Sequence, residues 1–300
     1  MLVKRRLILV TFASVVITAV WFMSCCSRLR SEGLGIIGDE RSLTFKPAPK
    51  GLAIVTHGWI EKGQGDWPED MAIEIQKHVD PNLWLCGYFD WSEGAKTLNP
   101  TDAAEYARDI AGPKLADEII ELGGDLRHIH LIGHSNGCWV ISEAAKKLAG
   151  KMNPASDRGG MKMDLHLTFL DAYVPAFWDE GSLGDVNVPA GAKYWVEHYY
   201  TRDYTLQWTQ QDLSCAHNVD VTDIDQGLKD HNFPWRWYYA TVSGKYPKGH
   251  FLDDRKLVYT ADGIEYGFAR SRESADPDGW ERSLKLPPAN KAVELEKSQK

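Results

Sequence analysis

The chain has 300 residues, of which 43% are hydrophobic, and it carries a formal net charge of −8. A chain of this length and apolar content can bury a large core, and α/β folds of this size commonly form one domain. The acidic balance disfavours nucleic acid as a partner, because binding to phosphates needs a basic surface.

Residues 1–26 have the pattern of a signal peptide or of a membrane or lipid anchor. Lys4-Arg5-Arg6 forms a positive start, and Leu7 to Met23 is an apolar-to-neutral run of 17 residues. This run lies at the lower edge for a transmembrane helix, which needs about 20 residues. Ser24-Cys25-Cys26 follows and resembles a bacterial lipoprotein processing box. A lipoprotein, an uncleaved signal anchor and a secreted protein all stay open, and each is exported to a membrane-anchored, periplasmic or extracellular location.

The cysteines do not form the framework of a disulfide-rich protein. Cys86 and Cys138 lie in apolar stretches, where a cysteine is usually a small buried hydrophobic residue. A disulfide between them stays open, because sequence alone does not show pairing. CxxC and HExxH spacings are absent from the sequence, which disfavours a zinc site. We expect no metal site and no cofactor.

The first part of the exported chain alternates strands with helices. Residues 27–50 are expected to form a polar linker that ends in an edge strand near Leu43 to Lys46. Apolar periodicity then predicts, in order, a strand over 51–56, a helix over 67–79, a strand over 84–89, and a helix over 101–122 that is kinked at Pro113.

Residues 126–140 contain a strand, a sharp turn and a helix in immediate succession. A buried strand is expected over 128–132 and a helix over 138–148, with Gly133 to Gly137 as the turn between them. The glycines two positions before and after Ser135 let strand and helix approach closely, so that the serine sits on a strained backbone with its hydroxyl exposed. Ser135 is therefore the candidate nucleophile.

Further strands are predicted over 165–170, 193–200 and 218–222. Strands that alternate with helices predict a mostly parallel sheet with helices on both faces. Ligands bind beyond the carboxyl ends of such strands, where Trp59, Ser135, Asp171 and His231 all fall. We expect the catalytic domain to span residues 51–270, and the proline-containing, charged segment 271–300 to be a flexible tail.

A serine hydroxyl needs a base to become a nucleophile, and the base needs a carboxylate to hold its tautomer. The order Ser135, Asp171, His231 along the chain is the order of the α/β-hydrolase fold. The oxyanion that forms during acyl transfer needs backbone N–H donors. Asn136, which follows the nucleophile, and Trp59, in the turn after an earlier strand, are the predicted donors.

Five blocks resemble the pancreatic-type lipase family in order and spacing, over about residues 51–243. They are His57-Gly58-Trp59 with Trp67 downstream, Phe89-Asp90-Trp91, Gly133-His134-Ser135, Leu170-Asp171-Ala172 with Pro175 and Phe177, and His231 followed by Trp237-Tyr238-Tyr239. The resemblance implies the catalytic domain of such a lipase, with an α/β-hydrolase fold, the acid at Asp171 and the base at His231. It makes His57 and His134 supporting groups rather than bases.

Three features depart from the family. Asn136 stands where these lipases usually carry leucine, the 59 residues between Asp171 and His231 leave a short lid region, and no room remains for a C-terminal β-sandwich. The family's calcium site is not recognisable. Two rivals also stay open: His250, which lies in a Gly-His pair, as base, and Asp203, which follows a later strand, as acid.

The sequence thus predicts a serine hydrolase that cleaves carboxylic esters, with lipid esters as the first expectation (lipase or phospholipase A1-like). A short-chain esterase or another acyl hydrolase would use the same residues. A catalytically silent lipid-binding relative is the remaining alternative. The expected partners are a lipid or small ester substrate and a membrane, reached through the N-terminus, and no nucleic acid.

Overall fold

The computed structural model describes residues 32–38, 49–59, 66–152, 163–202, 209, 211–222, 231–243 and 268. Met1–Glu32 and Gly33–Lys300 form separate units, and the elements below all belong to the second. Five sequence predictions lie outside the described residues. They concern the leader over 1–26, the edge strand near Leu43 to Lys46, Asp203, His250 and the tail over 271–300.

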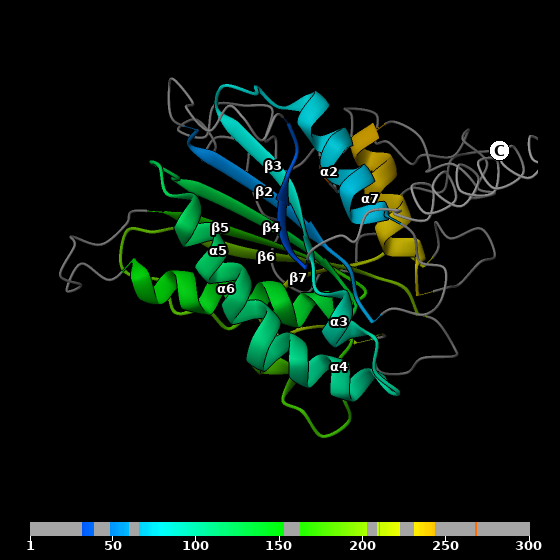
Figure 1. Ribbon diagram of the computed structural model, residues 1–300. Helices are drawn as coiled ribbons and strands as arrows, with labels where there is room; N and C mark the ends of the chain where they lie inside the picture. The colour runs from blue at the N-terminus through cyan, green and yellow to red at the C-terminus, as the bar shows by residue number, and fades with distance from the viewer. Residues whose placement is uncertain are drawn as a thin grey trace, which may run out of the picture. The chain divides into compact units, whose positions relative to one another are not determined.

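A seven-stranded sheet in the order β1-β3-β2-β4-β5-β6-β7 organises the described residues (Figure 1). Its strands are β1 (Gly33–Ile36), β2 (Gly51–Thr56), β3 (Trp84–Asp90), β4 (His128–His134), β5 (Asp164–Leu170), β6 (Tyr194–Tyr200) and β7 (His217–Asp220). Only β1 runs antiparallel to its neighbour among these strands. The predicted mostly parallel sheet is confirmed, and the chain has the α/β-hydrolase fold.

Helices cover both faces of the sheet (Figure 1). One face carries α2 (Trp67–His78) and α7 (Phe233–Ser243), and the other carries α3 (Ser92–Ala95), α4 (Pro100–Tyr106), α5 (Gly112–Leu122) and α6 (Gly137–Lys151). The buried apolar residues accordingly form two clusters, one on each side of the strands. Cys138 belongs to the first cluster and Cys86 to the second. Neither cysteine takes part in a disulfide, so the bond between them that the sequence left open is not formed.

The edge strand β1 lies in the segment that the sequence predicted as linker. It pairs with β3 from Gly33 opposite Asp90 to Ile36 opposite Gly87. A β-carbon on Gly35 would lie 2.5 Å from the Tyr88 ring, so a side chain there would have to displace that ring. Glycine is depleted in strands generally, which is why the pattern of these residues did not indicate one.

The helix predicted over 101–122 is divided by a π-helical turn, η1 (Ala107–Ala111). The Gly112 N–H donates to the Ala107 carbonyl, five residues earlier, and α5 starts with Pro113 in its first turn. Pro113 has no N–H for the carbonyl four residues before it, and its ring crowds that carbonyl. The wider turn relieves this conflict, so the helix is irregular in the turn that precedes the proline.

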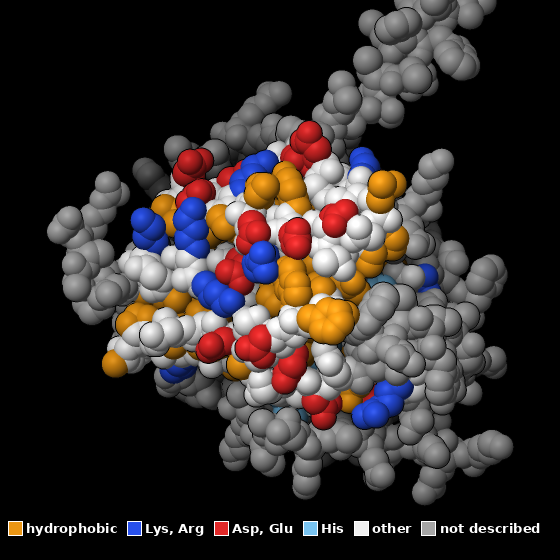
Figure 2. Space-filling model, turned by 90° about the horizontal axis from the view of Figure 1, so that it is seen from below, with side chains coloured by type: hydrophobic (Ala, Val, Ile, Leu, Met, Phe, Trp, Pro, Cys, Tyr) orange, Lys and Arg blue, Asp and Glu red, His pale blue; other side chains and the backbone are white. Residues whose placement is uncertain are grey.

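The face that carries α3 to α6 mixes charged and apolar side chains (Figure 2). Acidic and basic groups are interspersed there, as is usual for a solvent-exposed surface. The large apolar side chains that are exposed among the described residues are Leu98, Ile110 and Phe177. No helix within the described ranges has the length and apolar character needed to cross a bilayer.

Candidate active site

Ser135 sits in the turn between β4 and α6, with its backbone in the left-handed region at φ 54°. A β-carbon on Gly133 would lie 2.5 Å from the Gly137 carbonyl oxygen, and one on Gly137 would lie 2.4 Å from the His57 carbonyl oxygen. Both positions therefore require glycine. The strain at Ser135 is held by packing and by a 3.0 Å hydrogen bond from its N–H to the Leu170 carbonyl.

Asp171 occupies the corresponding place after the neighbouring strand β5. His134 and Leu170 are partners in the parallel pairing of β4 with β5, so the next residues, Ser135 and Asp171, leave the same edge of the sheet side by side. Asp171 is fully buried and also left-handed, at φ 49°. Its N–H donates to the Tyr199 carbonyl at 2.8 Å, which fixes its backbone to the next strand as well.

His231 meets Asp171 directly. Its Nδ1 lies 2.6 Å from Asp171 Oδ2, and the Thr201 N–H donates to Asp171 Oδ1 at 2.8 Å. Burial raises the pKa of the Asp171 carboxyl, and hydrogen bonds, that from His231 first, oppose the rise. Because an ionised carboxylate only accepts, His231 carries its hydrogen on Nδ1. A neutral His231 therefore has a lone pair on Nε2, as a general base requires.

His134 holds the backbone of His231 next to the serine turn. Its Nε2 donates to the His231 carbonyl at 2.9 Å, and the two rings lie 4.6 Å apart. Burial, with a smaller effect of the nearby His231, lowers the pKa of His134 well below its ordinary value, so this donor stays neutral. Within the described residues, the Ser135 hydroxyl makes no hydrogen bond to the His231 imidazole. Such bonds often tighten only when substrate is bound.

The turn that contains Trp59 lies next to Ser135, and Asn136 follows Ser135 directly in the chain. A β-carbon on Gly58 would lie 2.6 Å from the Ser135 β-carbon, so the His57-Gly58-Trp59 turn packs directly against the nucleophile. Asn136 directly precedes α6. The first N–H groups of a helix have no acceptor within the helix. Its side chain donates to the Pro100 carbonyl at 2.8 Å and so ties this turn to α4.

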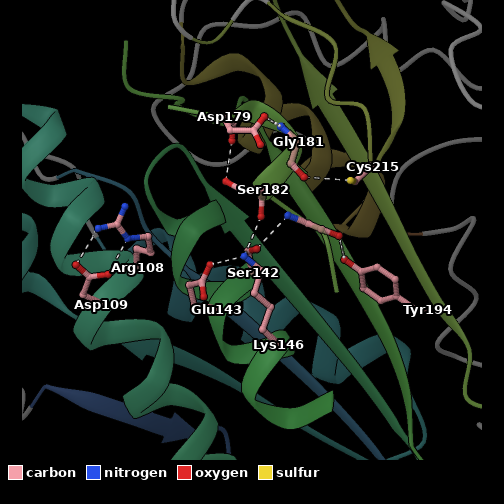
Figure 3. Close-up of polar contacts among 11 residues, drawn as sticks. Arg108, Asp109, Ser142, Glu143, Lys146, Asp179, Gly181, Ser182, Tyr194 and Cys215 are labelled. Carbon is pink, nitrogen blue, oxygen red and sulfur yellow. Dashed lines mark hydrogen bonds and ion pairs between the residues drawn. The ribbon is translucent and has the colours of Figure 1, made fainter. Parts of the chain in front are cut away.

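The loop that follows Asp171 is clamped onto α6 (Figure 3). Lys146 Nζ donates to the Ser182 carbonyl at 2.8 Å, and the Gly184 N–H donates to Ser142 Oγ at 3.0 Å. The Cys215 thiol donates to the Gly181 carbonyl at 3.4 Å from the segment before β7. These contacts fix the connection from Asp171 to β6 on both sides.

The structure thus brings together the segments of all five predicted site residues. The sequence missed the contact made by Thr201, because a backbone donor has no distinguishing pattern. The family resemblance implied that His134 is a supporting group, but not that it bonds to the His231 carbonyl. The rivals Asp203 and His250 lie outside the described residues. Among the described residues, no group of three or more His, Cys, Asp or Glu side chains is arranged to hold a metal ion.

Residues 40–156 match the family model described as Lipase. A pancreatic lipase-related protein 2 from Bos taurus is 30% identical over 221 residues, covering 63% of this chain and 43% of the relative. Over these segments the chain is similar to the pancreatic-type lipases. A pancreatic triacylglycerol lipase from Mus musculus is 34% identical over 101 residues, covering 32% of this chain and 21% of the relative.

The lipase match has clear bounds within the chain. It contains Trp59, Ser135 and Asn136 and stops before Asp171 and His231, which therefore rest on the geometry above. The chain spans less than half the length of the curated relatives named here. An inactive pancreatic lipase-related protein 1 from Mus musculus is also 34% identical, over 110 residues, covering 35% of this chain and 22% of the relative.

Among solved structures, a Xanthomonas campestris α/β serine hydrolase without a lid has 15% identity and a TM-score of 0.30, covering 55% of this chain and 63% of that one.

Proposed function

We propose that the protein is a serine hydrolase that cleaves carboxylic esters, with lipid esters as its substrates. The observation that carries the proposal is the 2.6 Å contact between His231 Nδ1 and the buried Asp171 carboxylate, at the edge of the sheet where Ser135 also lies. Ser135 is the proposed nucleophile, His231 the base, and Asp171 the acid that orients it. The Trp59 and Asn136 N–H groups are the proposed oxyanion donors.

In this proposal, Ser135 Oγ attacks the ester carbonyl carbon while His231 Nε2 takes the hydroxyl proton. The imidazolium that forms is stabilised by Asp171, and the negative carbonyl oxygen by the two backbone donors. The intermediate collapses, its C–O bond to the alcohol breaks, and His231 returns the proton to the departing alkoxide. Water then repeats the sequence on the acyl-enzyme and releases the carboxylic acid. No cofactor takes part in these steps.

Replacing Ser135 tests the nucleophile. Ser135→Ala is expected to lower the esterase rate by about 10⁴-fold or more, because a triad acts as a unit and only binding and oxyanion effects remain. Covalent labelling by a fluorophosphonate should disappear in the same variant. Ser182→Ala is a suitable control, since Ser182 Oγ donates to the Asp179 carbonyl away from the proposed site. Labelling that persists in Ser135→Ala, with the modified peptide mapped elsewhere, contradicts the assignment.

The lipid substrate class is supported by the names of the relatives, which include a triacylglycerol lipase. A series of p-nitrophenyl esters of increasing acyl length tests it. A rate that rises to a maximum at long chains agrees with a lipase or a phospholipase A1-like enzyme, whereas a maximum at short chains indicates an esterase. Silence on every ester would favour the lipid-binding alternative, and one relative of similar identity is named as inactive.

We further propose that the protein is exported and associates with a membrane through its N-terminus, where it meets its substrate. The leader pattern of residues 1–26 supports this. Cell fractionation and mass spectrometry of the mature N-terminus test the proposal. If Cys25 is the lipidated residue, Cys25→Ala should alter processing and leave the membrane fraction. A soluble mature protein that starts well beyond residue 26 contradicts membrane association.

A further inference from the structure

His57 uses both ring nitrogens next to the proposed oxyanion donor Trp59. Its Nδ1 lies 2.8 Å from the Gly58 carbonyl oxygen, and its Nε2 lies 3.3 Å from the Trp91 N–H. The imidazole stacks on the Trp91 ring at 5.3 Å with an interplanar angle of 1°. The ring is therefore fixed in position and in rotation.

The hydrogens on this imidazole can be assigned from its partners. A carbonyl oxygen only accepts, so Nδ1 must carry a hydrogen, and Nε2 accepts from Trp91 when the ring is neutral. Asp90 Oδ1 faces Nε2 at 3.4 Å and would pair with it if the ring took a second proton. The Nδ1–H group that donates to Gly58 is therefore present in the protonated ring and in the neutral Nδ1–H tautomer. It is absent only from the neutral Nε2–H tautomer.

The Gly58 carbonyl belongs to the same planar peptide unit as the Trp59 N–H. In a trans peptide these two groups point in opposite directions. His57 and its partner Trp91 lie on the β3 side of β2, whereas Ser135 follows β4, on the other side of β2. A carbonyl that points toward His57 therefore turns the Trp59 N–H toward the serine side.

The His57 backbone is held as firmly as its ring. The Trp91 indole Nε1 donates to the His57 carbonyl at 2.9 Å. That carbonyl also packs against Gly137, where a β-carbon would be only 2.4 Å away. On the other side of the Gly58–Trp59 peptide, the Trp59 indole Nε1 donates to the Thr97 carbonyl at 3.1 Å. Rotation of this peptide is thus opposed by contacts of the residues before and after it.

We propose that His57 is a positioning residue whose Nδ1–H bond to the Gly58 carbonyl aims the Trp59 N–H at the oxyanion. The inference rests on the proposed function, because it assigns a role within that oxyanion site. It predicts that His57 affects the transition state more than substrate binding, since the aimed donor matters most when charge develops on the oxygen.

Two amide variants separate this role from simple packing. Asn at position 57 can place an N–H near the position of Nδ1, whereas Gln extends its amide toward the position of Nε2. His57→Gln should lower kcat by about 10- to 100-fold, somewhat less than the loss of a whole donor, with KM nearly unchanged. Inhibition by a trifluoromethyl ketone, whose serine adduct carries the oxyanion, should weaken in parallel. His57→Asn should recover most of kcat, and His78→Gln, at the exposed end of α2, is the control.

The tautomer of His57 is measured independently by ¹⁵N NMR of the wild-type protein, with expected protonation at Nδ1. An Nε2–H tautomer in an active wild type overturns the positioning role alone. Equal losses in the Asn and Gln variants, or a change confined to KM, do the same. A wild type that neither cleaves esters nor reacts with a fluorophosphonate overturns the proposed function and, with it, this role of His57.

Discussion

At the scale of single residues, the site depends on two residues, Ser135 and Asp171, whose backbone conformation is unfavourable. Ser135 and Asp171 have φ values of 54° and 49°, and a left-handed L-residue costs roughly 1–2 kcal/mol. Such strain persists only where surrounding contacts determine the conformation. Here the N–H groups of both residues are bonded to carbonyls of neighbouring strands, so the sheet itself supports the two positions.

Asp171→Asn should separate activity from stability. The amide can still accept from Thr201, but its NH₂ group faces His231 Nδ1 and drives the imidazole into the other tautomer. We expect kcat to fall by about 10⁴-fold while the fold is kept. Asp203→Asn, at the rival position from the sequence, should keep most of its rate. The reverse pattern would move the acid to Asp203 and leave Ser135 as the nucleophile.

The same variant has a predicted pH signature. Burial raises the folded-state pKa of Asp171, so the native protein holds its proton up to a higher pH than the unfolded chain does. Stability from this group is then lost as pH rises through that interval. Asp171→Asn should therefore gain stability relative to wild type on going from pH 4 to pH 7, measured by urea unfolding. A constant difference between the two proteins would contradict the raised pKa.

The parts of the site that depend on residue type and spacing along the chain could be predicted from the sequence. The paired glycines around Ser135 are required by backbone contacts, and the structure shows those contacts at Gly133 and Gly137. Asp171 and His231 followed from their order and from the family resemblance. The bonds made by Thr201 and His134 could not be predicted, because they depend on which strand ends and loops become neighbours in space.

At the scale of elements, two glycines in helices make a matched test of packing. A β-carbon on Gly112 would lie 2.7 Å from the Glu143 side chain and the Val140 carbonyl on α6, whereas one on Gly150 meets nothing within 4 Å. Alanine favours helix by about 1 kcal/mol over glycine, but overpacking costs about 1–3 kcal/mol. Gly112→Ala should therefore lower Tm and Gly150→Ala should raise it. Equal shifts in calorimetry would mean that α5 and α6 are not closely packed.

Most elements were predictable from periodicity, with ends correct to within a few residues. The exceptions have physical reasons. Strand β1 contains Gly35, which fits against Tyr88, and α7 is rich in aromatic residues that favour helix only because they pack onto the sheet. The π turn widens the helix where Pro113 would crowd the carbonyl four residues before it, whereas the sequence pattern had indicated one continuous helix with a kink at that proline.

At the scale of the whole molecule, buried histidines should make the fold sensitive to acid. Burial lowers the pKa of His128 and His134 well below 6.5, and it lowers the pKa of His198 to about 4. Below pH 6.5 these histidines bind protons in the unfolded chain but stay neutral in the folded protein. Their contribution to the free energy of unfolding is therefore complete above pH 6.5 and is lost as the pH falls below it. Each neutral histidine contributes a slope of up to about 1.4 kcal/mol per pH unit.

Urea unfolding at pH 7.5 and pH 5.0 measures this effect. The free energy of unfolding should be lower at pH 5.0, in spite of the opposite contribution from Asp171. An equal or higher free energy at pH 5.0 would mean that these histidines take up protons in the folded protein.

The contacts that hold His231 also have a consequence for how the chain folds. They join residues separated by 60 and 97 positions in the sequence, to Asp171 and His134 respectively. Closing such long loops costs entropy before any contact compensates for it, so non-local pairings slow folding. The strands and helices can recover earlier in a refolding protein than the alignment of base and nucleophile. Catalytic competence is then among the last properties to return.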